Sequence, residues 1–189
     1  SFIKKIKMKI NQSFALLAAL AICSGAMISM PAMAQKKVTL SDAEIASVAV
    51  TANQIDINYA AIAKEKSKNT DVLRFAETMA KDHQAVIDQA VALVTKLGVT
   101  PKDNSTSKKL LAGAAKTEKQ LRLKSGDAFN KAYIDNEVAY HKAVIGTVEG
   151  VLIPQSKNAE LKGLLQAIMP ALKTHLEHAE MVQKEIAKK

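Results

Sequence analysis

The sequence predicts an all-α protein, an antiparallel four-helix bundle with a short connecting helix between the second and third long helices. Ala, Leu and Lys, which lose little conformational freedom in a helix, are abundant, whereas aromatic residues make up 4% of the 189 residues and Trp is absent. Apolar residues recur at spacings of three and four along four long segments, as they do on the buried face of a helix. No segment alternates apolar and polar residues between turn signals, which is the pattern expected of strands.

The first 34 residues are predicted to be a cleavable signal peptide. Four lysines precede an apolar run that begins at Phe14, and the run ends at Ala32-Met33-Ala34. Small residues at these two positions are what a signal peptidase requires, so cleavage is expected before Gln35. An uncleaved membrane anchor is the alternative, since the apolar run approaches spanning length, but polar residues and Gly dilute it. We therefore expect residues 1–34 to be a signal peptide and 35–189 a single helical-bundle domain, periplasmic or associated with the envelope.

The charge and the cysteine content of the mature chain limit which partners and which metal sites are expected. The chain has 27 Lys and Arg and 18 Asp and Glu, giving a net charge of +9. Because the leader holds four of the lysines and no acid, the mature charge is 23 − 18 = +5. These basic residues lie among acids and without interleaved aromatics, so we expect no nucleic-acid partner and only a loose association with anionic envelope surfaces. Cys23 lies in the leader, which excludes disulfides and thiolate metal sites from the mature domain.

Two capped helices are expected in the first half of the mature chain. The sequence Ser41-Asp42-Ala43-Glu44 is a capping box, in which the serine and the glutamate cap each other's backbone. The apolar seam that follows consists of Ile45, Val48, Ala52, Ile55, Tyr59 and Ile62. Thr70 is expected to cap the second helix, and Gly98 to end it. The second seam consists of Val72, Ala76, Met79, His83, Val86, Ala90, Leu93 and Leu97.

The sequence of the second half of the mature chain predicts a connecting helix and two further long helices. Residues 99–106 are expected to form a loop, and the connecting helix to run from about Lys108 to Leu123. The third long helix is expected to begin near Asp127 and to end at Pro154, which cannot continue a helix freely. The fourth is expected from about Asn158, with a bend at Pro170.

Three of the four histidines of the mature chain replace apolar residues on these seams. His83, His141 and His175 each lie near the middle of a different long helix. Antiparallel helices of similar length bring their midpoints to one level, so we expect the three imidazoles to converge inside the bundle. His178 lies one turn beyond His175.

Buried imidazoles need partners, because an unsatisfied polar group in a core costs roughly 1–3 kcal/mol. A transition metal would satisfy all of them together, and three neutral imidazoles suit zinc or copper. The candidate metal ligands are His83, His141, His175 and His178. The candidates for hydrogen bonds to these ligands are Asp82, Glu137 and Glu177. The alternative is a structural hydrogen-bonded network without metal, with Tyr133, Tyr140 and Asn136 as partners.

Several short motifs resemble a known family. They are Phe75-Ala76-x-x-Met79-x-x-Asp82-His83, then Phe129-x-x-x-Tyr133 with His141, then Pro170-x-Leu172-x-x-His175-Leu176. With them the chain from about Leu40 to Ile186 resembles an exported bacterial family, domain of unknown function 4142, whose members are often labelled outer-membrane proteins. The resemblance implies a ferritin-like bundle and export but no established activity. The Glu-x-x-His motif of di-iron carboxylate proteins is absent, so ferroxidase chemistry is not expected.

The sequence leaves the function open between three hypotheses. We expect a non-enzymatic envelope protein that binds a metal or small ligand at the seam histidines, and no catalytic residue is predicted. A small metal-dependent hydrolase or redox enzyme is the first alternative, but it needs a cleft, and the seams look too continuous to leave one. The second alternative is a purely structural or interaction bundle whose histidines only bond to neighbours. The oligomeric state is not predicted.

Overall fold

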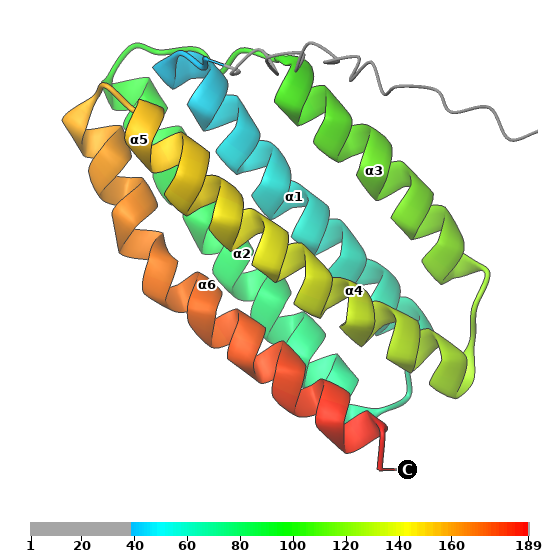
Figure 1. Cartoon of the computed structure of the whole chain (residues 1–189). Coiled ribbons are helices and arrows are strands. Elements are labelled where there is room, and N and C mark those ends of the chain that lie inside the picture. Colours follow the sequence, from blue (N-terminus) through cyan, green and yellow to red (C-terminus); the bar gives the residue numbers. More distant parts are fainter. Residues whose placement is uncertain (1–38, 189) are drawn as a thin grey trace, which may run out of the picture. The chain divides into compact units, whose positions relative to one another are not determined.

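A computed structural model describes residues 39–188 of the protein (Figure 1). Four long helices and one shorter helix make up most of this range: α1 (Asp42–Lys66), α2 (Thr70–Lys96), α3 (Ser105–Arg122), α4 (Gly126–Thr147) and α6 (Ala159–Ile186). A π-helical turn, η1 (Val148–Leu152), and one helical turn, α5 (Ile153–Gln155), continue from α4. The described range contains no strand, so the all-α prediction is confirmed. The predicted signal peptide, residues 1–34, lies outside it.

The helices form a bundle in which sequence neighbours pack most closely. α1 packs along α2 and α4 along α6, and short links at residues 67–69 and 156–158 make both pairs antiparallel (Figure 1). At one end of the bundle, Asp42 Oδ1 accepts a hydrogen bond of 2.9 Å from the Lys157 amide. The start of α1 therefore lies beside the start of α6, and the midpoints of the long helices meet at one level.

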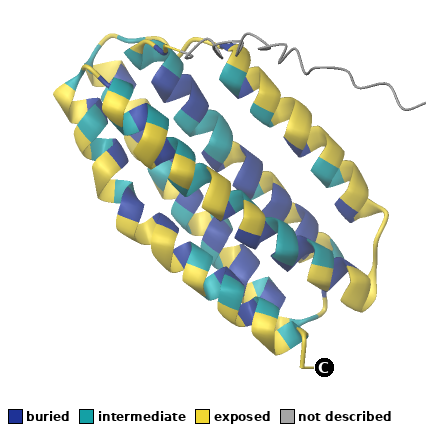
Figure 2. Ribbon diagram, in the orientation of Figure 1, coloured by how far each residue is buried: buried dark blue, intermediate teal, exposed yellow. Residues whose placement is uncertain are grey.

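The shorter helix α3 lies against the outer side of α1. The Lys102 amide donates to the Ala43 carbonyl at 3.0 Å near the start of both helices, and Arg122 pairs with Glu65 at 3.0 Å near their ends. α3 thus runs parallel to α1, and most of its surface is exposed (Figure 2). α1 is consequently covered on three sides, by α2, α3 and α4.

Side-chain caps set where the helices begin. The capping box at Ser41 and Glu44 is present as predicted, with the Ser41 amide donating to Glu44 at 2.9 Å. The prediction that Thr70 caps α2 is wrong: Asn69 is the cap, and its Oδ1 accepts from the Asp71 amide at 2.9 Å. An asparagine amide reaches the first-turn donors as a threonine hydroxyl does, so either residue fits the position. Gly98 ends α2 with φ of 62°, the left-handed conformation expected after a helix.

The prediction that Pro154 ends the third long helix is wrong. Pro154 does not end α4, because helical structure continues through η1 to Gln155 and Pro154 occupies the first turn of α5. Pro154 has no amide hydrogen to donate, and the π-helical turn before it shifts the hydrogen bonds by one residue, with the Ile153 amide donating to the Val148 carbonyl five residues back. α6 is helical through Pro170, and the bend expected there stays a prediction. The connecting helix also starts earlier than predicted, at Ser105, because Asn104 caps it.

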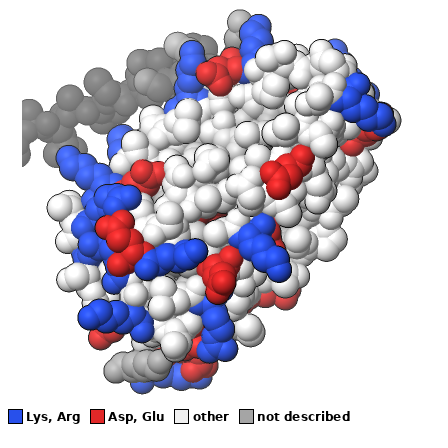
Figure 3. All heavy atoms as spheres, turned by 180° about the vertical axis from the view of Figure 1, so that it is seen from behind, with Lys and Arg blue, Asp and Glu red and all other residues white. Residues whose placement is uncertain are grey.

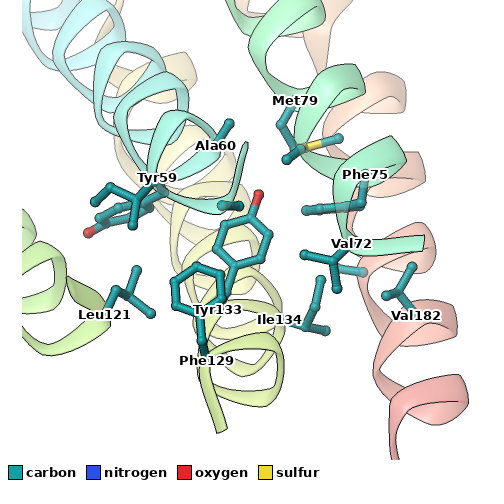
Figure 4. Close-up of a cluster of buried hydrophobic side chains, with 14 of the residues drawn as sticks. Tyr59, Ala60, Val72, Phe75, Met79, Leu121, Phe129, Tyr133, Ile134 and Val182 are labelled. Atoms are coloured by element: carbon teal, nitrogen blue, oxygen red, sulfur yellow. The ribbon is translucent and has the colours of Figure 1, made fainter. Parts of the chain in front are cut away.

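Two apolar clusters fill the interior. One lies toward the end of α1 and the start of α2, where Tyr133 packs on Phe129 and Phe75 with ring centroids 6.1 and 6.2 Å apart (Figure 4). The other lies toward the start of α1 and includes Ile45 and Leu152. The helix midpoints, where the seam histidines occur, lie between these clusters.

The outer surface is charged but mixed. On the face seen in Figure 3, basic and acidic side chains lie close to one another. Ion pairs such as Lys142–Glu180 at 2.8 Å and Lys173–Glu149 at 2.9 Å join neighbouring helices. Among the described residues, no helix is long and apolar enough to cross a membrane.

Candidate metal centre

Three histidines from three helices meet in the middle of the bundle. His83 lies on α2, His141 on α4 and His175 on α6, and their side chains are buried, with 4%, 1% and 6% of each residue exposed. Their ring centroids are 5.2 to 5.7 Å apart. The structure thus brings together the three imidazoles that the helical spacing places at one level.

The fourth histidine is not part of this cluster. His178 is half-buried, and its ring packs edge-on against Phe75 with centroids 5.1 Å apart. Burial, together with the nearby His175 and Arg74, lowers the pKa of His178. Glu177, predicted as a hydrogen-bonding partner of the ligands, is exposed on α6.

Two buried carboxyl groups join the cluster. Asp56 on α1 and Glu137 on α4 are both fully buried. Asp56 Oδ2 lies 3.3 Å from His83 Nε2 and 3.5 Å from His141 Nε2. Glu137, one turn before His141, places Oε2 3.6 Å from His141 Nδ1. We term the five residues His83, His141, His175, Asp56 and Glu137 the central cluster.

The hydrogen bonds of His83 fix which of its nitrogens carries the proton. Asn53 Nδ2 donates to the Ala49 carbonyl at 2.8 Å, which orients the amide so that Oδ1 faces His83. The distance from His83 Nδ1 to Asn53 Oδ1 is 2.7 Å, so Nδ1–H donates to this oxygen. In the neutral ring, Nε2 is therefore the nitrogen with a free lone pair.

His141 is held in the same tautomer by its own helix. Its Nδ1 lies 3.0 Å from the Glu137 carbonyl oxygen, which can only accept, so Nδ1 is the protonated nitrogen. The remaining lone pair is on Nε2. Both Nε2 atoms that approach Asp56 are thus acceptors in the neutral rings.

The approach of two acceptors to a carboxylate requires a positive partner between them. His83 Nε2, His141 Nε2 and both Asp56 oxygens are buried and form no hydrogen bond. Lone pairs that face one another this closely repel, unless a proton or a metal cation lies between them. A proton on Asp56 or a bound cation would each remove this repulsion.

Burial displaces the protonation equilibria of the cluster toward the neutral form of each group. Burial lowers the pKa of His83 to about 3 and that of His141 to about 4, aided by repulsion from the neighbouring histidines. Both rings are therefore neutral near pH 7, the form that binds metals. Burial raises the pKa of Asp56 to about 8, and it also raises the pKa of Glu137, which the negative charge of Asp56 raises further.

His175 faces both the cluster and the surface. Its Nε2 lies 2.9 Å from Asp82 Oδ2, and the Asp82 side chain is 43% exposed. Its Nδ1 is buried and forms no hydrogen bond. A neutral ring that donates from Nε2 keeps its Nδ1 lone pair, so Asp82 orients His175 much as carboxylates orient metal-ligating histidines.

The donor atoms form two groups of three that share His141, and each group is close enough together to hold one cation. Donor atoms of His83, His141 and His175 lie within 4.8 Å of one another, as do those of Asp56, Glu137 and His141. Tetrahedral zinc with bonds of about 2.0–2.1 Å sets its ligand atoms roughly 3.3–3.4 Å apart. The distances of 3.3 and 3.5 Å from Asp56 to the two Nε2 atoms are close to this value.

A family model described as domain of unknown function (DUF4142) matches residues 28–182 of the chain. The chain belongs to this family. No curated protein and no solved structure matches it. The family gives no activity to transfer, so the function of this DUF4142 protein has to be argued from its central cluster.

Two hollows reach the cluster. A cavity of about 120 Å³ between α1, α4 and α6 touches His83 and His141, and a groove of about 270 Å³ between α2 and α6 touches His83 and His175. The expectation that continuous seams leave no cleft is therefore wrong. Alanines explain the difference, because Ala49 and Ala52 line the cavity and Ala167 and Ala171 line the groove, where larger residues would fill the space.

The sequence-based reasoning missed Asp56 and Asn53. They lie on α1 beside the apolar seam, where a polar residue is usually exposed. A second stripe was nevertheless visible, because Ala49, Asn53, Asp56, Ala60 and Ala63 recur at spacings of three and four. Small residues on both sides of two polar ones indicate a close approach of neighbouring helices rather than solvent.

Proposed function

We propose that this protein binds a divalent transition-metal ion in the middle of its helical bundle, with His83, His141, His175 and Asp56 as ligands. One observation carries the proposal: the unprotonated Nε2 atoms of His83 and His141 both face the buried Asp56 carboxyl at 3.3 and 3.5 Å. A cation is the partner that satisfies all three groups at once. Glu137 is the candidate for a further ligand on the same side.

Zinc and copper are the candidate ions, and the donor set favours Zn²⁺ and Cu²⁺ over Cu⁺. Imidazole and carboxylate donors suit Zn²⁺ and Cu²⁺, whereas Cu⁺ prefers thiolate and thioether ligands. Asn53, Asp82 and the Glu137 carbonyl hold the far nitrogens of the three rings. The site is therefore oriented before the ion arrives, which raises affinity.

We further propose that the protein acts in the bacterial cell envelope and that its bundle is ferritin-like. The leader-like residues 1–34 support export. The two antiparallel pairs, α1 with α2 and α4 with α6, support the ferritin-like arrangement. In this proposal the primary role is binding, in metal storage, buffering or transfer.

Metal titration of the purified protein, stripped with EDTA, tests the proposal. We expect one Zn²⁺ per chain by calorimetry, with affinity at least 100-fold weaker in His141→Gln and in Asp56→Asn. His178→Gln is the matched control, since His178 is a half-buried histidine on α6 that lies outside the cluster, and this variant should bind as wild type does. Equal binding by all four proteins, or none by wild type, would show that the histidines form only a structural network.

A metal-dependent enzyme is the second candidate, and the cavity that touches His83 and His141 favours it. An ion with three or four protein ligands and an adjoining cavity has room for water or substrate, as hydrolytic zinc sites do. Hydrolysis of p-nitrophenyl acetate by the zinc-loaded protein, and its loss in His141→Gln but not in His178→Gln, would support catalysis. Activity that persists after EDTA treatment would argue against it.

A further inference from the structure

The cavity beside the central cluster has an apolar body and a polar end. Its walls come from α1, α3, α4, η1 and α6, and the apolar lining includes Val48, Leu110, Val148, Leu152, Leu165 and Leu172. The polar residues Asn53, Asp56, His83 and His141 all lie at the level of the helix midpoints. Val48 and Leu152 lie toward the other end of the bundle, so the cavity extends from the cluster along the apolar interior.

The size of the cavity sets the size of a ligand. Its volume is about 120 Å³. An apolar cavity of about 150 Å³ in a protein core stays dry and binds benzene. A molecule with one six-membered ring, or a short branched chain, therefore matches the space.

The polar end selects the head group of that ligand, because its unpartnered atoms are acceptors. The Asn53 amide already donates to Ala49, and the Tyr140 hydroxyl donates to the Ala52 carbonyl at 2.8 Å. His83 Nε2 and His141 Nε2 have lone pairs and no hydrogen bond. A hydroxyl group fits this end, whereas a carboxylate would meet lone pairs and buried acidic groups.

We propose that this cavity binds a small neutral alcohol or phenol, with its hydroxyl donating to Nε2 of His83 or His141 and its ring or chain in the apolar body. The inference goes beyond the proposed metal site and applies to the metal-free protein, because the hydroxyl and an ion would compete for the same Nε2 lone pairs. It names the class of small molecule that this chain takes up beside its central cluster.

Phenol is the probe, with benzene and benzoate as controls of the same ring size. The protein is stripped with EDTA, and binding is followed by the amide chemical shifts of the folded chain. We expect saturable binding of phenol that perturbs amides along the cavity, such as those of Asn53 and Val144. Benzene should bind roughly fivefold more weakly for want of one hydrogen bond, and benzoate at least tenfold more weakly.

A matched pair of substitutions locates the binding. Ala52→Leu fills the cavity and should weaken phenol binding at least tenfold. Ala167→Leu makes the same change in the groove between α2 and α6. Ala167 does not line the cavity, so this variant should leave phenol binding unchanged. Where circular dichroism shows that Ala52→Leu is unfolded, Val144→Phe fills the same cavity from α4.

Three outcomes would overturn the proposal: no saturable phenol binding, binding that Ala52→Leu and Val144→Phe both leave intact, or equal affinity for phenol and benzene. A Zn²⁺ titration of the same samples keeps the two proposals separate. Phenol binding without zinc binding would refute the metal site alone, and zinc binding without phenol binding would refute the cavity ligand alone.

Discussion

Each histidine of the central cluster has one nitrogen held by a protein group. Asn53 holds His83, the Glu137 carbonyl holds His141, and Asp82 holds His175. These partners do not need to touch an ion, yet they decide which lone pair points into the cluster. Orienting residues of this kind typically change metal affinity by about 10–100-fold when they are replaced.

Asn53→Ala should therefore weaken Zn²⁺ binding by about tenfold or more, because His83 can then place its proton on either nitrogen. Asn58→Ala is the matched control, since Asn58 is an exposed asparagine on the same helix. Competition with a chromophoric chelator measures both. Equal affinity in the two variants would show that Asn53 has no orienting role.

The buried carboxyl of Asp56 should give the metal-free protein an unusual pH dependence. Burial raises its pKa to about 8 in the folded chain from an ordinary value of 3.8, so the folded state holds the proton more tightly, and stability is lost as the pH rises from about 4 to 8. His83 and His141 have lowered pKa values and act in the opposite sense. Their contribution to stability is present above about pH 6.5 and is lost as the pH falls below that value. Among these four residues, only the carboxyl groups with raised pKa values, Asp56 and Glu137, change the stability between pH 6.5 and 8.

Urea unfolding of the metal-free protein at pH 6.5 and pH 8 tests this expectation. Asp56→Asn removes one titrating group, and each such group contributes up to about 1.4 kcal/mol per pH unit. Wild type should therefore lose about 1–2 kcal/mol more than Asp56→Asn over this interval. Parallel losses in the two proteins would mean that Asp56 ionises in the folded state as readily as in the unfolded one.

At the scale of elements, the caps decide where each helix starts. Asn69 accepts hydrogen bonds from two first-turn amides of α2, at 2.9 and 3.2 Å. Asn69→Ala should lower the free energy of unfolding by about 1 kcal/mol, and Thr70→Ala, one residue later, by clearly less. Chemical denaturation of both variants measures the difference. A larger loss in Thr70→Ala would restore the cap position predicted from sequence.

The sequence predicts the long helices well because periodicity arises from burial of one face. The seams at Ile45–Ile62 and Leu161–Ile186 need no tertiary information, and neither does the capping box at Ser41. The end of α4 depends on how η1 packs, which local sequence does not encode, so Pro154 was misleading. Asp56 was missed for a related reason: α1 is covered on three sides, so its buried surface is wider than one seam.

For the molecule as a whole, the central cluster is a polar layer between two apolar clusters. The cluster with Phe75 and Tyr133 and the cluster with Ile45 and Leu152 are apolar. The layer between them holds two buried carboxyl groups and three imidazoles, each with at least one atom that forms no hydrogen bond. Such a layer costs stability until its charges and lone pairs are satisfied. The fold retains it, which is expected of a functional site rather than of an optimised core.

Metal binding should therefore stabilise the whole bundle. An ion that binds only the folded chain adds about 2.7 kcal/mol at a free concentration of 100 times its Kd. For a domain of this length that corresponds to a rise in Tm of roughly 5–10 °C. A thermal melt with and without Zn²⁺ should show this rise in wild type and in His178→Gln, but not in His141→Gln. The comparison of His178→Gln with His141→Gln distinguishes a specific site from nonspecific binding. Nonspecific binding of zinc to surface groups would shift the Tm of all three proteins alike. A shift confined to proteins with an intact cluster ties the stability of the fold to the occupant of its polar layer.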